Sequence, residues 1–262
     1  MPSPRPSTPG TDAAPPGFAM ARRSRVRGRA ACVALWAAVV AVPAGAQSAG
    51  SGQFGATVAL TSQLVDRGIP VSRSTPILQG ALLWNSPSGW SAGVSASSEA
   101  RSPGRLLETL AQVAHAWSLS NDWQMQADVL YYRYDQDSSW RRYDRTELGA
   151  SFIYRDVLTV GLSAADMSHY RGHGPRLAAD LDLRWPVAPH LSVTAGLGAA
   201  QYLIPASYPY NDASHYEYGH LGAVWENGPW RIELKRIGTR HAPHPPGASD
   251  LSAWNATLAR SF

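Results

Sequence analysis

The sequence predicts an all-β fold, an antiparallel transmembrane β-barrel of twelve strands, and three observations lead to this prediction. First, from about residue 53 to Phe262, short segments alternate apolar and polar residues, as strands with one apolar face do. Second, the connections between these segments alternate between short and long. Third, the chain has no run of 18 or more apolar residues, so no transmembrane helix is expected. Only a closed barrel could then span a membrane, because lipid cannot satisfy an open sheet edge.

The N-terminal 46 residues are expected to lie outside the barrel. Residues 1–19 form a Pro-rich extension, and Met20 is an alternative start of translation. Residues 20–46 resemble a secretory signal peptide, with arginines in 22–29, an apolar run over 30–42 and a small-residue cleavage site at 44–46. Residues 47–262 then form the barrel domain. The only cysteine, Cys32, lies in the signal, so no disulfide is expected in the mature chain.

The charge of the mature chain argues against nucleic acid as a partner. The full sequence has a pI near 9.4, but residues 1–46 contain six of its arginines and only one aspartate. The remaining residues carry 17 basic and 18 acidic side chains. The high pI is therefore mainly a property of the signal.

Twelve segments carry the strand pattern. In 230–235, for example, Trp230, Ile232 and Leu234 share one face and the charged residues share the other. The predicted strands are 53–66, 75–85, 90–98, 105–118, 123–134, 143–154, 157–167, 176–185, 191–203, 214–226, 230–240 and 250–262. The turns at 86–89, 119–122, 155–156, 186–190 and 227–229 are short, and the connections between them are mostly longer. Bacterial outer-membrane barrels have this alternation, with short periplasmic turns and long outer loops.

Aromatic residues concentrate beside the short turns. An aromatic girdle at one membrane interface is predicted from this position, because amphipathic rings lie between lipid and water. Its members are Trp84, Trp90, Trp117, Trp123, Tyr154, Trp185, Trp225, Trp230 and Phe262. The terminal Phe262 on an alternating strand is also typical of the signal that the barrel-insertion machinery recognises.

One stretch of about 40 residues resembles a known family. Arg67-Gly68, the run from Pro76 to Gly80 and Ser88-Gly89-Trp90 are similar to motifs of the proteobacterial Gcw-type (TorF) porin family. The chain has Gln63-Leu64 where that family usually has Asp-Tyr. The resemblance implies an outer-membrane barrel with a pore and does not imply a particular solute.

The side chains opposite the girdle should face the lumen, since charge at membrane depth is tolerated only where water or a partner meets it. The predicted lumen-lining residues are Glu108, Asp128, Arg145, Glu147, Asp180, Asp182, Arg184, His220, Arg231, Glu233 and Lys235. These charges could line a narrow wet channel, or pair with one another and seal the lumen. Small inward residues on several strands favour a small pore. The near balance of acidic and basic residues predicts weak ion preference.

The predicted function is passive diffusion of small polar or ionic solutes across the outer membrane of a Gram-negative bacterium, with no enzymatic activity. The expected partners are outer-membrane lipid, the insertion machinery and small solutes, and no cofactor is expected. One alternative is a sealed structural or adhesive barrel that acts through its outer loops. A less favoured one is a lipid-facing hydrolase, for which His115 and His215 are outward histidines without a clearly placed serine. Four loop histidines, His169, His173, His241 and His244, suggest a metal site only weakly, so none is predicted.

Overall fold

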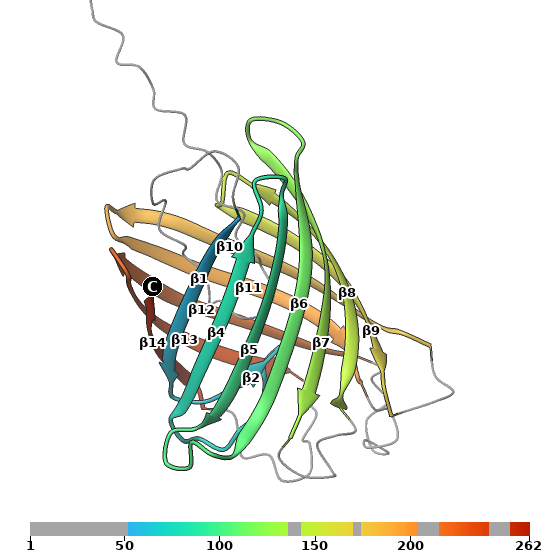
Figure 1. Ribbon diagram of the computed structural model, residues 1–262, viewed down its shortest axis with the longest axis vertical. Helices are drawn as coiled ribbons and strands as arrows, with labels where there is room; N and C mark the ends of the chain where they lie inside the picture. Colours follow the sequence, from blue (N-terminus) through green and yellow to red (C-terminus); the bar gives the residue numbers. More distant parts are fainter. Residues whose placement is uncertain (1–51, 136–142, 170–173, 204–214, 241–251) are drawn as a thin grey trace, which may run out of the picture.

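The computed structural model describes residues 52–135, 143–169, 174–203, 215–240 and 252–262 (Figure 1). In this part of the chain, twelve strands close into one antiparallel barrel, and two short strands form a separate hairpin. The barrel strands are β1 (Gln53–Thr61), β4 (Ile77–Asn85), β5 (Trp90–Glu99), β6 (Leu106–Ser118), β7 (Trp123–Tyr134), β8 (Arg145–Tyr154), β9 (Leu158–Met167), β10 (Arg176–Ala188), β11 (Leu191–Gln201), β12 (His215–Asn227), β13 (Trp230–Arg240) and β14 (Trp254–Ser261). The hairpin strands are β2 (Val65–Asp66) and β3 (Ile69–Pro70). The predicted fold class and strand number are confirmed.

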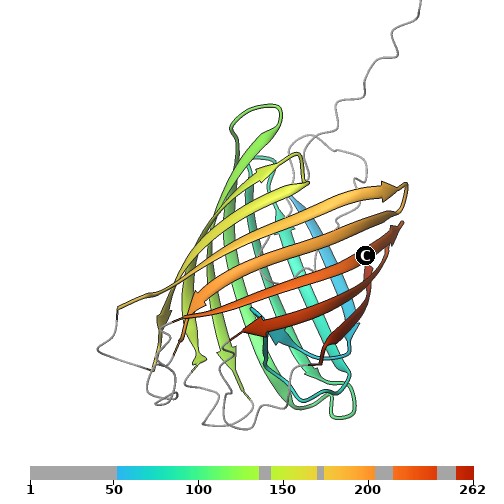
Figure 2. The same ribbon diagram turned by 180° about the vertical axis from the view of Figure 1, so that it is seen from behind.

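The barrel is a meander closed by its first and last strands. Each strand pairs with its neighbour in sequence, and β1 pairs with both β4 and β14. Residues Thr57 to Thr61 pair with Ser261 to Thr257, and the backbone N–H of Phe262 donates to the carbonyl of Ala56 at 2.9 Å. Closure leaves no free sheet edge. Figure 2 shows the strongly tilted strands from β10 to β14 that complete the wall.

The two faces of the wall differ in chemistry because strand side chains alternate. Large apolar residues such as Leu82, Leu197 and Leu221 are more than 60% exposed on the outward face. Polar residues such as Gln79, Glu147 and Thr194 are buried on the inward face, which we call the lumen wall. The barrel is thus apolar outside and polar inside, the reverse of a water-soluble barrel. Within the described residues, no helix is both long and apolar enough to cross a membrane.

Short turns connect the strands at one end of the barrel, which we call the short-turn end, and longer segments connect them at the other, the long-loop end (Figure 1). At the short-turn end, Arg155 and Asp156 both have positive φ, as a tight hairpin turn requires. Arg155 also donates two hydrogen bonds to Asp122 in the adjacent turn. These hydrogen bonds hold the pKa of the Asp122 carboxyl below its usual value. The two neighbouring turns are thereby joined.

The nine predicted girdle residues all lie on the outward face near the short-turn end. Their positions are Trp84 on β4, Trp90 on β5, Trp117 on β6, Trp123 on β7, Tyr154 on β8, Trp185 on β10, Trp225 on β12, Trp230 on β13, and Phe262 after β14. The guanidinium of Arg260 lies over two of these rings, 5.2 Å from the centroid of Trp230 and 4.9 Å from that of Phe262. An outward arginine can therefore place its charge in the ring of aromatic side chains.

Three predicted boundaries differ from the structure by three residues or more, and one of them is the end of β10, which continues to Ala188 beyond the predicted residue 185. The last strand begins at Trp254, whereas residue 250 was predicted. The first strand ends at Thr61, although the alternation continues to residue 66. Beyond Thr61 the chain leaves the wall, because the Thr61 hydroxyl donates to the carbonyl of Gln63, and Val65 and Asp66 pair with Pro70 and Ile69.

The lumen and its inward hairpin as a candidate functional site

The eleven residues predicted to line the lumen all have the inward parity of their strands. Glu108, Arg145, Glu147 and Glu233 are buried, and the other seven are half-buried. Ten of them separate into two ion-paired networks and a middle zone between them, while Glu108 is buried on β6 and forms no ion pair among the described residues. A hairpin that the sequence did not predict organises the network nearest the long-loop end.

The hairpin consists of β2 and β3 joined by Arg67 and Gly68. Both turn residues have positive φ, 46° and 73°, which is the conformation of a type I′ turn. Glycine adopts it without strain, and this explains the local need for Gly68. Below the turn, the backbone N–H of Val71 donates to the carbonyl of Leu64 at 2.8 Å, and the Ser72 hydroxyl accepts from the N–H of Leu64 at 2.9 Å. Residues 64–72 therefore form a closed local unit.

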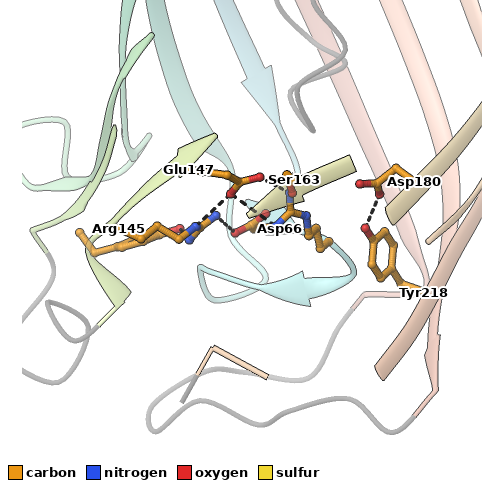
Figure 3. A network of polar contacts seen from close by, with 8 residues as sticks. Asp66, Arg145, Glu147, Ser163, Asp180 and Tyr218 are labelled. Atoms are coloured by element: carbon orange, nitrogen blue, oxygen red, sulfur yellow. Dashed lines mark hydrogen bonds and ion pairs between the residues drawn. The ribbon is translucent and has the colours of Figure 1, made fainter. Parts of the chain in front are cut away.

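The tip of the hairpin is bound to the lumen wall by polar contacts (Figure 3). The Arg67 guanidinium forms an ion pair with Glu147 on β8 and donates to the Ser163 hydroxyl on β9 at 2.8 Å. The hydroxyl of Thr239 on β13 donates to the carbonyl of Gly68 at 2.7 Å. Arg67 is only 7% exposed, so its charge is compensated mainly by protein groups.

The hairpin crosses the lumen from one wall to the other. It begins at the end of β1, where Asn255 on the adjacent strand donates to the carbonyl of Gln63 at 2.7 Å. Its tip reaches β8 and β9, which lie about half-way round the barrel from β1 in the strand order. The residues between base and tip therefore occupy the interior at this level, as Figure 3 shows for Asp66.

Apolar contacts hold both sides of the hairpin. Leu64 and Val71 belong to a buried cluster with apolar and aromatic residues of the strands β4, β6, β7 and β9 and with Tyr143, which precedes β8. Ile69, on the other side, packs against a second cluster on β10–β12 and the residue that follows β11, formed by Ala178, Ala200, Tyr202 and Tyr216. The long-loop half of the lumen is consequently filled by packed side chains at the level of the hairpin.

Arg145 is the centre of the network at the long-loop end. Its guanidinium donates to Asp66 at 2.7 Å, to the Tyr134 hydroxyl at 3.0 Å and to Glu147 at 3.3 Å. It also lies 3.9 Å from the centroid of the Tyr132 ring. Glu147 is shared by Arg145 and Arg67, and Asp66 belongs to the hairpin strand β2, so two ion pairs connect the hairpin to the wall.

A second network lies toward the short-turn end and joins strands β10, β12 and β13. Glu226 forms ion pairs with Arg184 and with Arg231, the latter at 2.7 Å. Glu233 pairs with Arg231 at 3.2 Å and with Lys235 at 2.7 Å. Three cations thus share two carboxylates, and this end of the lumen has a net positive charge.

Between the networks, three carboxylates face a more open part of the lumen. Asp180 accepts a hydrogen bond from the Tyr218 hydroxyl, and Asp182 lies 4.0 Å from the Nε2 atom of His220. Over the described residues, no lysine or arginine forms an ion pair with Asp128, Asp180 or Asp182. The middle zone is therefore acidic.

Glycines on neighbouring strands make room for these side chains. A Cβ atom added to Gly149 would lie 2.6 Å from a carboxylate oxygen of Asp128. The Asp128 side chain can lie flat against the wall only because Gly149 has no side chain. The acidic side chain therefore leaves space in the middle of the lumen.

Within the described part of the chain, neither outward histidine forms a hydrogen bond with a serine. His115 packs between Trp90 and Trp117, with ring centroids at 4.6 and 4.4 Å, and its Nδ1 atom has no hydrogen-bond partner among the described residues. His215 is exposed at the start of β12. His169 lies 3.8 Å from Asp144, whereas His173, His241 and His244 are outside the described residues. Over the described ranges, no group of three or more His, Cys, Asp or Glu residues could hold a metal ion.

Sequence reasoning missed Asp66, Arg67, Ser163 and Glu226 as members of these networks. One signal for the hairpin was present, since Gly68 stands between Val65-Asp66 and Ile69, and glycine is favoured in type I′ turns because it adopts positive φ. It was hidden because the alternation of β1 continues through residue 66. Nothing in the sequence alone indicated that the hairpin turns inward.

Comparison with known proteins supports the fold. No protein-family model and no curated protein matches the chain. Among solved structures, the chain is similar to the NanC porin, with a TM-score of 0.53 and 12% identity over 79% of this chain and 98% of that one. The KdgM porin gives a TM-score of 0.47 and 8% identity over 79% and 98% of the two chains. The likeness to the NanC structure shows that this chain has the barrel fold of that porin.

Proposed function

We propose that the chain is an outer-membrane porin of a Gram-negative bacterium that allows passive diffusion of small polar or ionic solutes. The observation that carries this proposal is the reversed distribution of side chains. Exposed leucines, valines and aromatic residues cover the outside, and charged residues of both signs lie inside. A lipid environment favours that outer surface, while inward charges favour water in the lumen. Outer-membrane lipid and the insertion machinery, acting on the C-terminal strand, are the partners that this reading requires.

The Gcw-type family resemblance supports the same proposal. Its matching residues include Arg67-Gly68, which is the turn of the inward hairpin, and the run 76–80, which enters β4. The first of these motifs thus lies in the element that crosses the lumen, and the second lies in the wall. The NanC structure, to which this chain is similar, is that of a porin, which agrees with a pore and leaves the solute open.

A sealed structural barrel is the second candidate, and the hairpin is the observation that favours it. Arg67, Arg145 and Glu147 are all less than 8% exposed, as expected for a filled section of the lumen. The two candidates differ in whether the hairpin is a permanent part of the core or can leave its position.

Liposome swelling tests the proposed function. Residues 47–262 would be refolded into proteoliposomes, together with a variant in which a short Gly-Ser turn replaces residues 63–72. We call this the hairpin-less variant, and it is feasible because Thr61 and Ile77 are already paired neighbours. Swelling that slows as the solute becomes larger is expected, at least in the variant. If both proteins show the heat-modifiable gel mobility of folded barrels and neither admits any solute, a pore is contradicted.

A further inference from the structure

The hairpin formed by β2 and β3 is attached to the barrel in a way that distinguishes it from the wall. Its two strands form a sheet of their own, separate from the barrel sheet. Its strands therefore share no backbone ladder with the barrel, and side-chain contacts predominate at the tip. Moving the hairpin would leave every pair of wall strands intact.

We propose that this hairpin is a plug with two positions: docked across the lumen, as in this structure, and released to open the pore. The inference rests on the proposed pore function. In the docked state the ion pair of Arg67 with Glu147 and the hydrogen bond from Thr239 to Gly68 fix the tip, while Leu64, Val71 and Ile69 fix the flanks. Release exchanges these contacts for water and opens the acidic middle zone to solutes from the long-loop end.

The tip contact is the adjustable part of the plug. Glu147 is shared between Arg67 on the hairpin and Arg145 on the wall, so its loss leaves two buried cations without their common carboxylate. Loss of Glu147 should therefore weaken the docking of the hairpin far more than it weakens the pairing of the wall strands. The equilibrium between docked and released positions can be shifted by any group that competes for this pair.

A reversible disulfide tests the plug directly. A Cβ atom added at Gly68 would lie 3.5 Å from the Cβ of Thr239, within the range of about 3.5–4.5 Å for disulfides. The Cβ of Tyr218 would be 2.7 Å away, so the tip must shift slightly to accept a cysteine. The predicted mature chain has no cysteine, because Cys32 is the only one in the sequence. The double variant G68C/T239C can therefore form only the intended bond within one chain.

Single-channel recording in a planar bilayer gives the readout. Oxidised G68C/T239C is expected to lose conductance, which returns when a reductant is added, while each single-cysteine variant behaves the same in both conditions. The Glu147→Gln variant is expected to open more often than the wild-type chain. Asp166→Asn removes a carboxylate from the exposed outward face of β9 and serves as the charge control, with no change expected.

Each outcome decides one of the two proposals. If oxidised G68C/T239C, with the disulfide verified by mass, conducts as the reduced form does, the plug is refuted and the pore stands. If it cannot be refolded, the hairpin-less variant and Glu147→Gln replace it. If neither of these two variants has longer open times than the wild-type chain, the plug is refuted. A folded hairpin-less barrel without conductance would refute the pore itself, and the plug with it.

Discussion

At the residue scale, the charges of the lumen differ in whether they are paired. Arg184, Arg231 and Lys235 have carboxylate partners, whereas Asp128, Asp180 and Asp182 form no ion pair with lysine or arginine in the described part of the chain. The near balance of acidic and basic residues in the sequence predicts weak ion preference only where paired and unpaired charges act alike. Paired charges cancel much of each other's field, so the unpaired carboxylates should dominate selectivity.

The double variant D180N/D182N should therefore reduce a preference for cations. Under a salt gradient, the reversal potential of the open pore is expected to move from the cation side toward zero, because two of the three carboxylates of the middle zone have lost their charge. The control D166N removes one charge from the outward face and should leave the reversal potential unchanged. An equal shift in both variants would contradict a lumen position for Asp180 and Asp182.

Arg145 should contribute more to stability than any exposed arginine. Replacing it with alanine removes the ion-pair partner of Asp66 and one of the two partners of Glu147, and breaking a buried pair typically costs about 3–5 kcal/mol. Arg133→Ala is the matched control, because Arg133 is exposed on the adjacent strand and its pair with Asp135 should contribute less than about 1 kcal/mol. Urea unfolding in lipid bilayers measures both. Similar losses in the two variants would show that the Arg145 network is not a stabilising centre.

At the element scale, most of the wall could be predicted from the sequence, and the hairpin could not. The strands β7 and β13 have the predicted bounds because their alternation and flanking turns are local signals. The hairpin depends on contacts between residues some 80 to 170 positions apart, such as Arg67 with Glu147 and Gly68 with Thr239. Such pairings follow from closure of the barrel, and a strand pattern contains no information about them. The inward parity of Glu147 was predictable because it follows from the local strand pattern. Its partners were not, because they come from distant segments of the chain.

The C-terminal strand should carry the insertion signal in its last residue. Deleting Phe262 is expected to lower the folded, heat-modifiable fraction in cell envelopes, because the terminal aromatic ring and its backbone pairing with Ala56 are both lost. Phe54→Ala provides the control, since Phe54 is also outward and strongly exposed near the short-turn end. Refolding in detergent should be affected little in either variant. An envelope fraction that stays normal without Phe262 would exclude this role.

At the scale of the whole molecule, the barrel combines an apolar exterior with an interior in three sections. The hairpin and the Arg145 network fill the section near the long-loop end, the unpaired carboxylates line the middle, and the network of Glu226 and Glu233 lies near the short-turn end. The exterior could be predicted from the sequence, because every strand follows one simple rule, with large apolar side chains on the outward face. The interior follows no such rule, since each charge can face water or a partner.

The measurement that tests the central claim most directly is single-channel conductance of refolded residues 47–262 in a planar bilayer, recorded beside the hairpin-less variant. A pore closed by an inward hairpin predicts brief, discrete openings of the wild-type chain and long openings of the variant. Folded barrels of both kinds that conduct no ions would contradict the claim. The function would then have to lie in the segments at the long-loop end or on the outward face.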